Sequence, residues 1–145
     1  MKIKATFKFL PVYVLILVLL VGLSGCLPAQ KAGLSDQQVA SVTESILKAI
    51  DANNYREFTQ DFSEQMKSVF TQDKFTQLRT LLYNASGNFI YMDIPSISNN
   101  QGYAIYRFPS KYANETVYVT VTFLIGGEEV EGLFFDSANL RKVSH

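Results

Sequence analysis

Four neighbouring residues, Leu23-Ser24-Gly25-Cys26, have the types and the order that a specific chemical modification needs. Ser24 and Gly25 are small, so the backbone there can enter a peptidase site as an extended strand. The thiol of Cys26 is a nucleophile that can carry a thioether-linked lipid. Because the chain has no second cysteine, that thiol cannot form an intramolecular disulfide. The pattern predicts cleavage between Gly25 and Cys26 and attachment of lipid to Cys26.

The segment before this motif has the layout of a secretory signal. Its basic residues come first: Lys2, Lys4 and Lys8. Residues 9–23 then carry no charge, as the apolar part of a signal peptide does. A membrane-spanning helix usually needs about 20 apolar residues. Extending the run through Leu27 approaches that length, so an uncleaved anchor is the alternative.

The motif at residues 23–26 resembles the lipobox of bacterial and archaeal lipoproteins, and this resemblance favours cleavage. Residues 1–25 are then a lipoprotein signal peptide, and the mature chain begins at Cys26. Burial of each acyl methylene contributes about 0.8 kcal/mol, so two or more long chains hold a protein stably on a membrane. We therefore expect a protein of the cell membrane or cell envelope, held by lipid on the extracytoplasmic side.

The composition of the mature chain excludes several kinds of site. Without residues 1–25 the chain has 120 residues, which is the size of one ordinary domain. It carries 10 basic and 13 acidic side chains, unlike the basic surface of a nucleic-acid-binding protein. The single histidine, His145, is the last residue, so sites built from several histidine or cysteine ligands are excluded. We expect no metal, no cofactor and no nucleic-acid partner.

Apolar spacing predicts helices in the first half of the mature chain. Residues 26–34 include proline and glycine, lack periodicity and are predicted to be a lipidated tether, so that the folded domain spans residues 35–145. Ser35 or Asp36 caps a first amphipathic helix, which ends near residues 53–54. The further helical segments begin, in order, at Tyr55, Ser63 and Thr71, and the last one ends at Gly87.

The second half changes to the alternation that is typical of strands. Four strands are predicted: residues 88–94, 103–108, 116–124 and 130–135. Turn signals separate them at Pro95-Ser96, Asn99–Gly102 and Gly126-Gly127. Helices followed by strands indicate an α+β fold, in which the N-terminal helices pack on a curved four-stranded antiparallel sheet.

Several short motifs carry a resemblance that covers roughly residues 35–143. They are Asp51–Tyr55, Phe58–Phe62, Met66-Lys67, Lys74-Phe75, Val119–Phe123, Gly126-Gly127 and Gly132–Phe135. Together they resemble small bacterial and archaeal lipoproteins of the nuclear-transport-factor-2-like superfamily, in a branch of undefined role. The resemblance implies a cone, with helices packed into the concave side of a curved antiparallel sheet. That superfamily includes dehydratases, isomerases and binding or assembly modules, so the fold does not select a function.

Enzymes of that superfamily often place an Asp–His pair, or an aspartate with a tyrosine that donates to an oxyanion, inside the cone. The sequence has no internal histidine, so acid–base chemistry would fall on carboxylates, tyrosines or lysines. Asp93 is the candidate base because alternation places it on one strand face with Phe89 and Tyr91. The alternative is a solvated residue on the outer face. Asp136, which ends the last strand, is predicted to be a turn residue.

Aromatic residues on the strands raise the hypothesis of an apolar pocket with hydroxyl groups in its wall. Its predicted lining residues are Tyr91, Asp93, Tyr106, Phe108 and Phe123. Further tyrosines that could join them are Tyr83, Tyr103 and Tyr118. The alternative is that the aromatic rings pack the core and the other tyrosines lie on the strands. The sequence alone does not decide between the pocket and this alternative.

Two smaller features have ordinary interpretations. Glu128, Glu129 and Glu131 form an acidic cluster, but a hairpin tip offers fewer convergent oxygens than calcium prefers, so a solvated turn is expected. Glycosylation sequons begin at Asn84 and Asn114, a number that chance explains.

These observations predict a lipid-anchored envelope protein that is a non-enzymatic module. The module is predicted to bind a small apolar ligand or a protein partner. One alternative is an enzyme of the superfamily that uses the cone as a pocket for a hydrophobic substrate, in proton transfer or dehydration. Another is a structural subunit of an envelope assembly, with homodimer formation through the sheet.

Overall fold

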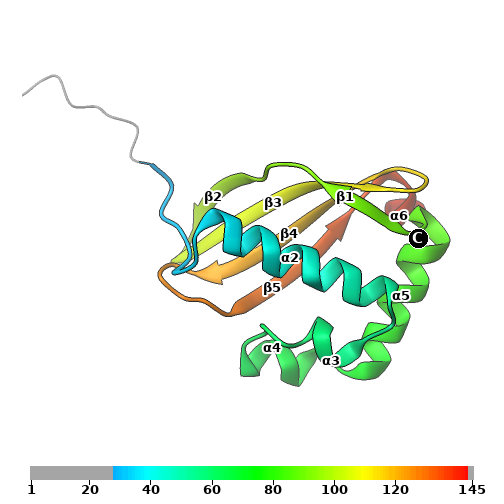
Figure 1. Cartoon of the computed structure of the whole chain (residues 1–145), viewed down its shortest axis with the longest axis horizontal. Helices are drawn as coiled ribbons and strands as arrows, with labels where there is room; N and C mark the ends of the chain where they lie inside the picture. The colour runs from blue at the N-terminus through cyan, green and yellow to red at the C-terminus, as the bar shows by residue number, and fades with distance from the viewer. Residues whose placement is uncertain (1–27, 144–145) are drawn as a thin grey trace, which may run out of the picture.

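The computed structural model describes residues 28–143, and their fold is α+β, as the sequence predicts (Figure 1). The helices are α2 (Asp36–Asp51), α3 (Tyr55–Phe58), α4 (Glu64–Val69), α5 (Gln72–Ser86) and α6 (Ala138–Val143). The strands are β1 (Phe89–Met92), β2 (Ser96–Asn100), β3 (Tyr103–Tyr112), β4 (Thr116–Leu124) and β5 (Val130–Asp136). The predicted signal peptide, Cys26 and His145 lie outside the described residues. Within residues 28–143, none of the helices has the length and apolar character needed to span a membrane.

Side-chain caps start the helices where the sequence predicts them. Ser35 accepts a hydrogen bond from the backbone N–H of Gln38, whose own side chain bonds back to the Ser35 backbone, which completes a capping box. Ser63 and Thr71 cap α4 and α5 in the same way, each accepting from the N–H three residues on. Gly87 ends α5 with a φ of 79°, a conformation that favours glycine. These predicted boundaries are confirmed.

The sheet is antiparallel and open, and it has five strands, so the expectation of four is wrong. Its order is β1-β3-β4-β5, and β2 also pairs with β3. The additional strand, β2, lies in a segment whose asparagines and serines favour a turn. It is held through its backbone, with Ser96 opposite Arg107 and Asn100 opposite Tyr103. The turn itself is confined to Gln101 and Gly102, both at positive φ.

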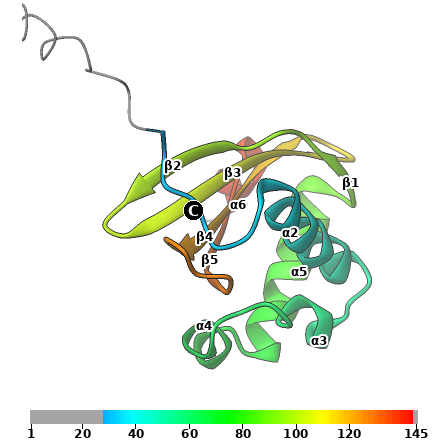
Figure 2. The same ribbon diagram turned by 60° about the vertical axis from the view of Figure 1, so that its left-hand side comes forward.

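The core lies between the helices and one face of the sheet, and Figure 2 shows α2 to α5 gathered on that side. The sheet contributes alternate side chains: Ala104, Tyr106, Phe108, Ser110 and Tyr112 from β3, and Val117, Val119, Val121 and Phe123 from β4. The helices contribute mainly Val39, Ile46, Leu47, Ile50, Phe58, Phe62, Phe75 and Leu82. Alternation along residues 116–124 predicts that Val117, Val119, Val121 and Phe123 share one face, and this prediction is confirmed.

Aromatic rings hold the short helices against this core. The ring of Phe58, on the four-residue α3, lies 4.9 Å from that of Phe62 and 4.8 Å from that of Phe75 between centroids. Helices this short are not stable alone, so this packing fixes their positions. Phe62 also brings its segment to the outer edge of β5, where it forms an isolated bridge with Val130.

The second half of the predicted tether is bonded to the sheet. The N–H of Gln30 donates to Asn99 Oδ1 at 2.6 Å, and the N–H of Gly33 donates to the carbonyl of Gly127 at 2.7 Å. Ala32 is buried. The ordered domain thus begins before the helix cap at Ser35.

Candidate functional site: an apolar groove beside the edge strand

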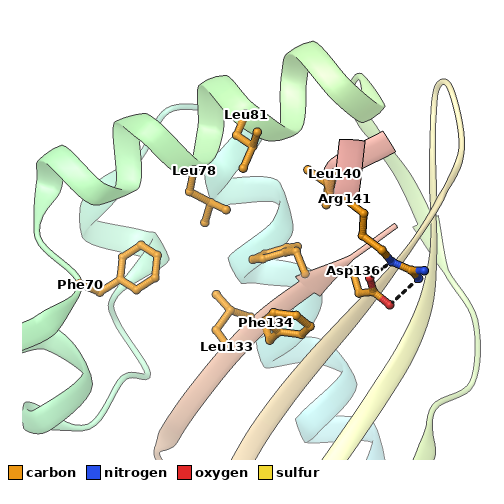
Figure 3. A pocket seen from close by; sticks show the side chains of 9 residues that line it. Phe70, Leu78, Leu81, Leu133, Phe134, Asp136, Leu140 and Arg141 are labelled. Atoms are coloured by element: carbon orange, nitrogen blue, oxygen red, sulfur yellow. Dashed lines mark hydrogen bonds and ion pairs between the residues drawn. The ribbon is translucent and has the colours of Figure 1, made fainter. Parts of the chain in front are cut away.

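A groove of about 330 Å³ lies between α5, α6 and β5 (Figure 3). It is lined by Phe70, Leu78, Leu81, Leu133, Phe134, Phe135, Asp136, Leu140 and Arg141. Seven of these nine side chains are apolar, which makes burial of apolar surface the main interaction that the groove can offer.

The register of β5 supplies the floor of the groove. Leu133 lies opposite Val121 and Phe135 opposite Val119, so both point to the helix side of the sheet. They are only half-buried because β5 is the last strand of the sheet order and the helices do not cover it fully. Phe134 belongs to the other face by alternation and is 64% exposed at the rim.

Helix α5 supplies the opposite wall. Leu78 and Leu81 are three residues apart and project from the same side of the helix toward β5 (Figure 3). Phe75 and Leu82 of the same helix instead enter the core. Phe70 closes one end of the groove from the C-terminus of α4, where its carbonyl accepts a hydrogen bond from the hydroxyl of Tyr55 at 2.9 Å.

An ion pair closes the other end. Arg141 donates from Nε to Asp136 Oδ1 at 2.7 Å and from Nη2 to Asp136 Oδ2 at 2.9 Å. Arg107 approaches the same carboxylate at 3.7 Å. The hydrogen bond from Arg141 lowers the pKa of Asp136. Asp136 is the last residue of β5 and lies opposite Tyr118, so the prediction of a turn residue is wrong. Its charge is neutralised by partners beside the groove.

Glu115 fixes α6 against the rest of the fold. Its carboxylate accepts hydrogen bonds from the hydroxyls of Ser86 and Ser137, at 2.6 and 2.8 Å, and from the backbone N–H of Asn139 at 3.2 Å. Partial burial raises the pKa of Glu115, but these hydrogen bonds outweigh it and the net pKa is lowered. Ser137 also caps α6 by accepting from the N–H of Leu140. One carboxylate therefore joins the C-terminus of α5, the β3–β4 turn and α6.

The pocket residues expected from the sequence lie elsewhere. Tyr106, Phe108 and Phe123 are fully buried in the core, and the rings of Tyr106 and Phe123 lie 5.9 Å apart between centroids. Tyr106 also accepts a hydrogen bond through its hydroxyl from the N–H of Ala32 at 3.2 Å. None of these three lines the groove. The helices cover this face of the sheet, so the three side chains pack the core instead of lining a pocket.

Tyr91 and Asp93 are exposed, and a β-bulge accounts for their positions. Phe89 lies opposite Tyr112 and Tyr91 opposite Lys111, so Ile90 is an extra residue in the strand. The bulge breaks the strict alternation that placed Phe89, Tyr91 and Asp93 on one face. Phe89 packs against the core, whereas Asp93 faces solvent and is not part of the groove.

The other candidates are also at the surface. Tyr83, Tyr103 and Tyr118 are 59%, 38% and 37% exposed, and the guanidinium of Arg107 lies 4.1 Å from the ring centre of Tyr118. In the acidic cluster Glu128 and Glu129 are exposed, while Glu131 accepts from the hydroxyl of Ser63 at 2.9 Å. The sequon residues Asn84 and Asn114 are exposed. Among residues 28–143, no three acidic, histidine or cysteine side chains gather as metal ligands would.

The groove residues that sequence reasoning missed lie mainly on β5 and α6. Apolar spacing over residues 71–87 predicts a helix with Leu78 and Leu81 in its apolar stripe, but it does not show that β5 is an edge strand that leaves part of that stripe uncovered. The signal for α6 was the cap at Ser137, followed by an apolar residue three positions on at Leu140.

Comparison with known proteins gives one family match. Residues 43–133, which are more than half of the chain, match a family described as a protein of unknown function, DUF3887. No curated protein matches the chain, and no solved structure does.

Proposed function

The chain belongs to the DUF3887 family of unknown function, and we propose that it is a lipid-anchored envelope protein that binds a small apolar ligand in the groove beside β5. The open sheet with helices on one face also supports our proposal that the domain is a cone of the nuclear-transport-factor-2-like kind.

The apolar lining of the groove is the observation that carries the binding proposal. Its volume of about 330 Å³ is at the lower end of the range for small-molecule sites. Each ligand methylene that leaves water there contributes about 0.8 kcal/mol. The two ionisable side chains in the lining, Asp136 and Arg141, bond to each other, which favours binding over acid–base chemistry.

A protein partner is the second candidate, and the edge of β5 favours it. Val130 bonds through its backbone to Asp61 and Ser63. Beyond it, within the described part of the chain, no backbone hydrogen bond joins residues 132–136 to any element other than β4. An extended peptide could therefore add to this edge and place apolar side chains in the groove.

The attachment is tested by mass. We expect the protein extracted from membranes to lack residues 1–25 and to carry lipid on Cys26, and Cys26→Ser to leave an uncleaved precursor or a released protein. The measurement is intact mass of the wild type and the variant. A wild-type mass equal to the unmodified full chain would contradict lipidation and support the uncleaved anchor.

The groove is tested with an uncharged apolar dye, Nile red, on the lipid-free chain from residue 27. Leu81→Arg puts a charge in the apolar wall, yet the half-exposed position lets the guanidinium reach water, so the domain should stay folded. We expect dye affinity to fall about tenfold, which is about 1.4 kcal/mol. Ile94→Arg, at a position that is 90% exposed and outside the groove, is the matched control. Equal affinities for the two variants would contradict the proposal. Native mass spectrometry of the wild type would show a retained ligand.

A further inference from the structure

The chain that leads from the proposed lipid anchor to the domain is bonded to strand β2 and to the β4–β5 turn, at one end of the sheet. Gln30 and Asn99 form a reciprocal pair, because the Asn99 amide also donates to the Gln30 carbonyl. The backbone carbonyl of Lys31 accepts a hydrogen bond from the N–H of Gly126 at 3.1 Å, next to the hydrogen bond between Gly33 and Gly127. Residues 30–33 are thus held by the end of β2 and the β4–β5 turn together.

The contact depends on the small residues at positions 32 and 33. A Cβ on Gly33 would lie 2.6 Å from the Gly126 carbonyl oxygen, closer than two such atoms can approach, so the segment fits only because residue 33 is glycine. Ala32 is buried beside it, and its N–H donates to the hydroxyl of Tyr106 in the core. The bonded segment is therefore part of the folded domain.

The topology places these partners opposite the β3–β4 turn. Tyr103, which begins β3, pairs with Leu124, which ends β4, and both the end of β2 and the β4–β5 turn adjoin this pair. At the other end of the same strands lies Asn114, about 30 Å away along a ten-residue strand. In Figure 1 the first described residues accordingly run to the β2 and β5 end, while α5 and α6 lie at the opposite end.

Covalent geometry limits how far this end can be from the lipid. Four residue steps separate Cys26 from Gln30. A fully extended chain spans at most about 3.6 Å for each step, so four steps reach at most about 14 Å from the bonded segment.

We infer that the end of the domain formed by residues 30–33, 99–102 and 125–129 faces the surface of the membrane that holds the lipid, and that the β3–β4 turn points away from it. This orientation rests on the proposed lipidation of Cys26. It makes that end of the domain an interaction surface whose partner is the headgroup layer of a bilayer.

The orientation decides from which side the groove is reached. Val130 lies next to the membrane-facing turn, and the groove begins at Leu133, about 10 Å farther along β5, and continues to Asp136. In the inferred orientation the groove therefore lies farther from the membrane surface than this turn, so a ligand reaches it through water and not directly from the acyl layer.

The tether, and not surface charge, holds the membrane-facing end of the domain at the bilayer. Glu128 and Glu129 are exposed there, and Lys31 is paired with Asp36 at 2.6 Å. An anionic bilayer does not attract such a surface. The lipid-free chain should therefore stay in solution when it is mixed with anionic vesicles.

The orientation is tested on the mature lipidated protein in phosphatidylcholine vesicles with a headgroup-attached nitroxide quencher. Because Cys26 is the only native cysteine and carries the lipid, an introduced cysteine takes a fluorescent label alone. We expect the label at Glu129→Cys, in the β4–β5 turn, to lose most of its fluorescence. The label at Asn114→Cys, in the β3–β4 turn, should keep most of it. Both positions are exposed.

A longer tether provides the control. A flexible insert of about 20 Gly and Ser residues between Leu27 and Pro28 gives a reach of about 25 Å, so the difference between the two labels should shrink. Equal quenching of the two labels without the insert, or a difference that the insert does not change, would overturn the orientation. Intact mass and vesicle sedimentation come first. Protein without lipid that stays in the supernatant overturns the attachment and the orientation with it, whereas lipidated, vesicle-bound protein with equal quenching overturns the orientation alone.

Discussion

Individual side chains divide into those that hold the fold and those that leave surface free for binding. The alternation in β4 predicts its inward residues correctly, because one face of a central strand is fully covered. The groove residues could not be predicted in this way. Leu78 and Leu133 satisfy the same apolar pattern as core residues, and only the extent of helix cover leaves them half-buried.

Phe123→Ala and Leu78→Ala should therefore differ in their effect on stability. Phe123 is fully buried, so its truncation should cost about 3–5 kcal/mol. Leu78 is half-exposed in the groove, so its loss should cost about 1 kcal/mol. Urea denaturation of the lipid-free chain measures both. Equal losses would mean that the groove is filled in solution.

Glu115→Gln should lower stability by about 1–2 kcal/mol at neutral pH, because the hydrogen bonds from Ser86, Ser137 and Asn139 lose their charged acceptor. The folded pKa of Glu115 is lowered, so the stabilisation is complete above its unfolded pKa of about 4.3 and disappears as pH falls through the folded value. The difference between wild type and variant should shrink in this acid range. A difference in unfolding free energy that stays constant from pH 7 to the acid range would contradict this account.

Whole elements were predicted wherever local signals agreed. Caps and apolar spacing marked α2, α4 and α5, and alternation marked β3, β4 and β5. The polar strand β2 was missed because Ser96–Asn100 contains turn-forming residues and is held by backbone pairing to β3. The position of residues 30–33 also depends on tertiary contacts. Their composition predicts a tether, but their backbone carbonyls and N–H groups form hydrogen bonds with residues at the end of the sheet.

Asn99→Ala should release this segment without unfolding the domain. It removes both hydrogen bonds to Gln30, at an exposed position where the global free energy of unfolding depends little on the side chain. Amide exchange of Gly33 and Gly126, followed by NMR, should become up to about tenfold faster, as expected for a loss of about 1–1.5 kcal/mol in local opening.

Asn100→Ala is the matched control for this release. Asn100 is the next residue of the same strand, it is also exposed, and its side chain makes no hydrogen bond to residues 28–33. Unchanged exchange in Asn99→Ala, or the same acceleration in both variants, would show that the reciprocal pair does not hold the segment.

On the scale of the whole molecule, the proposed attachment and the proposed binding site occupy different parts of one small domain. The end of β2 at Asn99 and the turn at 125–129 bond to the chain that leads to the proposed lipid anchor, and the groove lies along the far half of β5. The groove depends on β5 being an edge strand, since one end of β5 bonds to the segment at residues 61–63 and the rest is left open to the groove. The sequence alone does not show which strand lies at the edge of the sheet, so it does not reveal that these two regions are separate.

Phe134 and Phe135 test whether stability and binding can be separated in this domain. Phe134 is 64% exposed at the rim of the groove, so Phe134→Ser should shift the free energy of unfolding by no more than about 0.5 kcal/mol. It should nevertheless weaken Nile red binding, because the ring forms part of the apolar wall. Phe135 packs against the core from the helix side of the same strand, so Phe135→Ser should lower stability by about 2 kcal/mol or more. Urea titrations and dye titrations on the two variants give both quantities.

If Phe134→Ser reduced stability as much as Phe135→Ser, the rim would belong to the core and the groove would not be a preformed site. If it changed neither quantity, the ligand would not contact the rim, and binding would have to be sought deeper along Leu78 and Leu133.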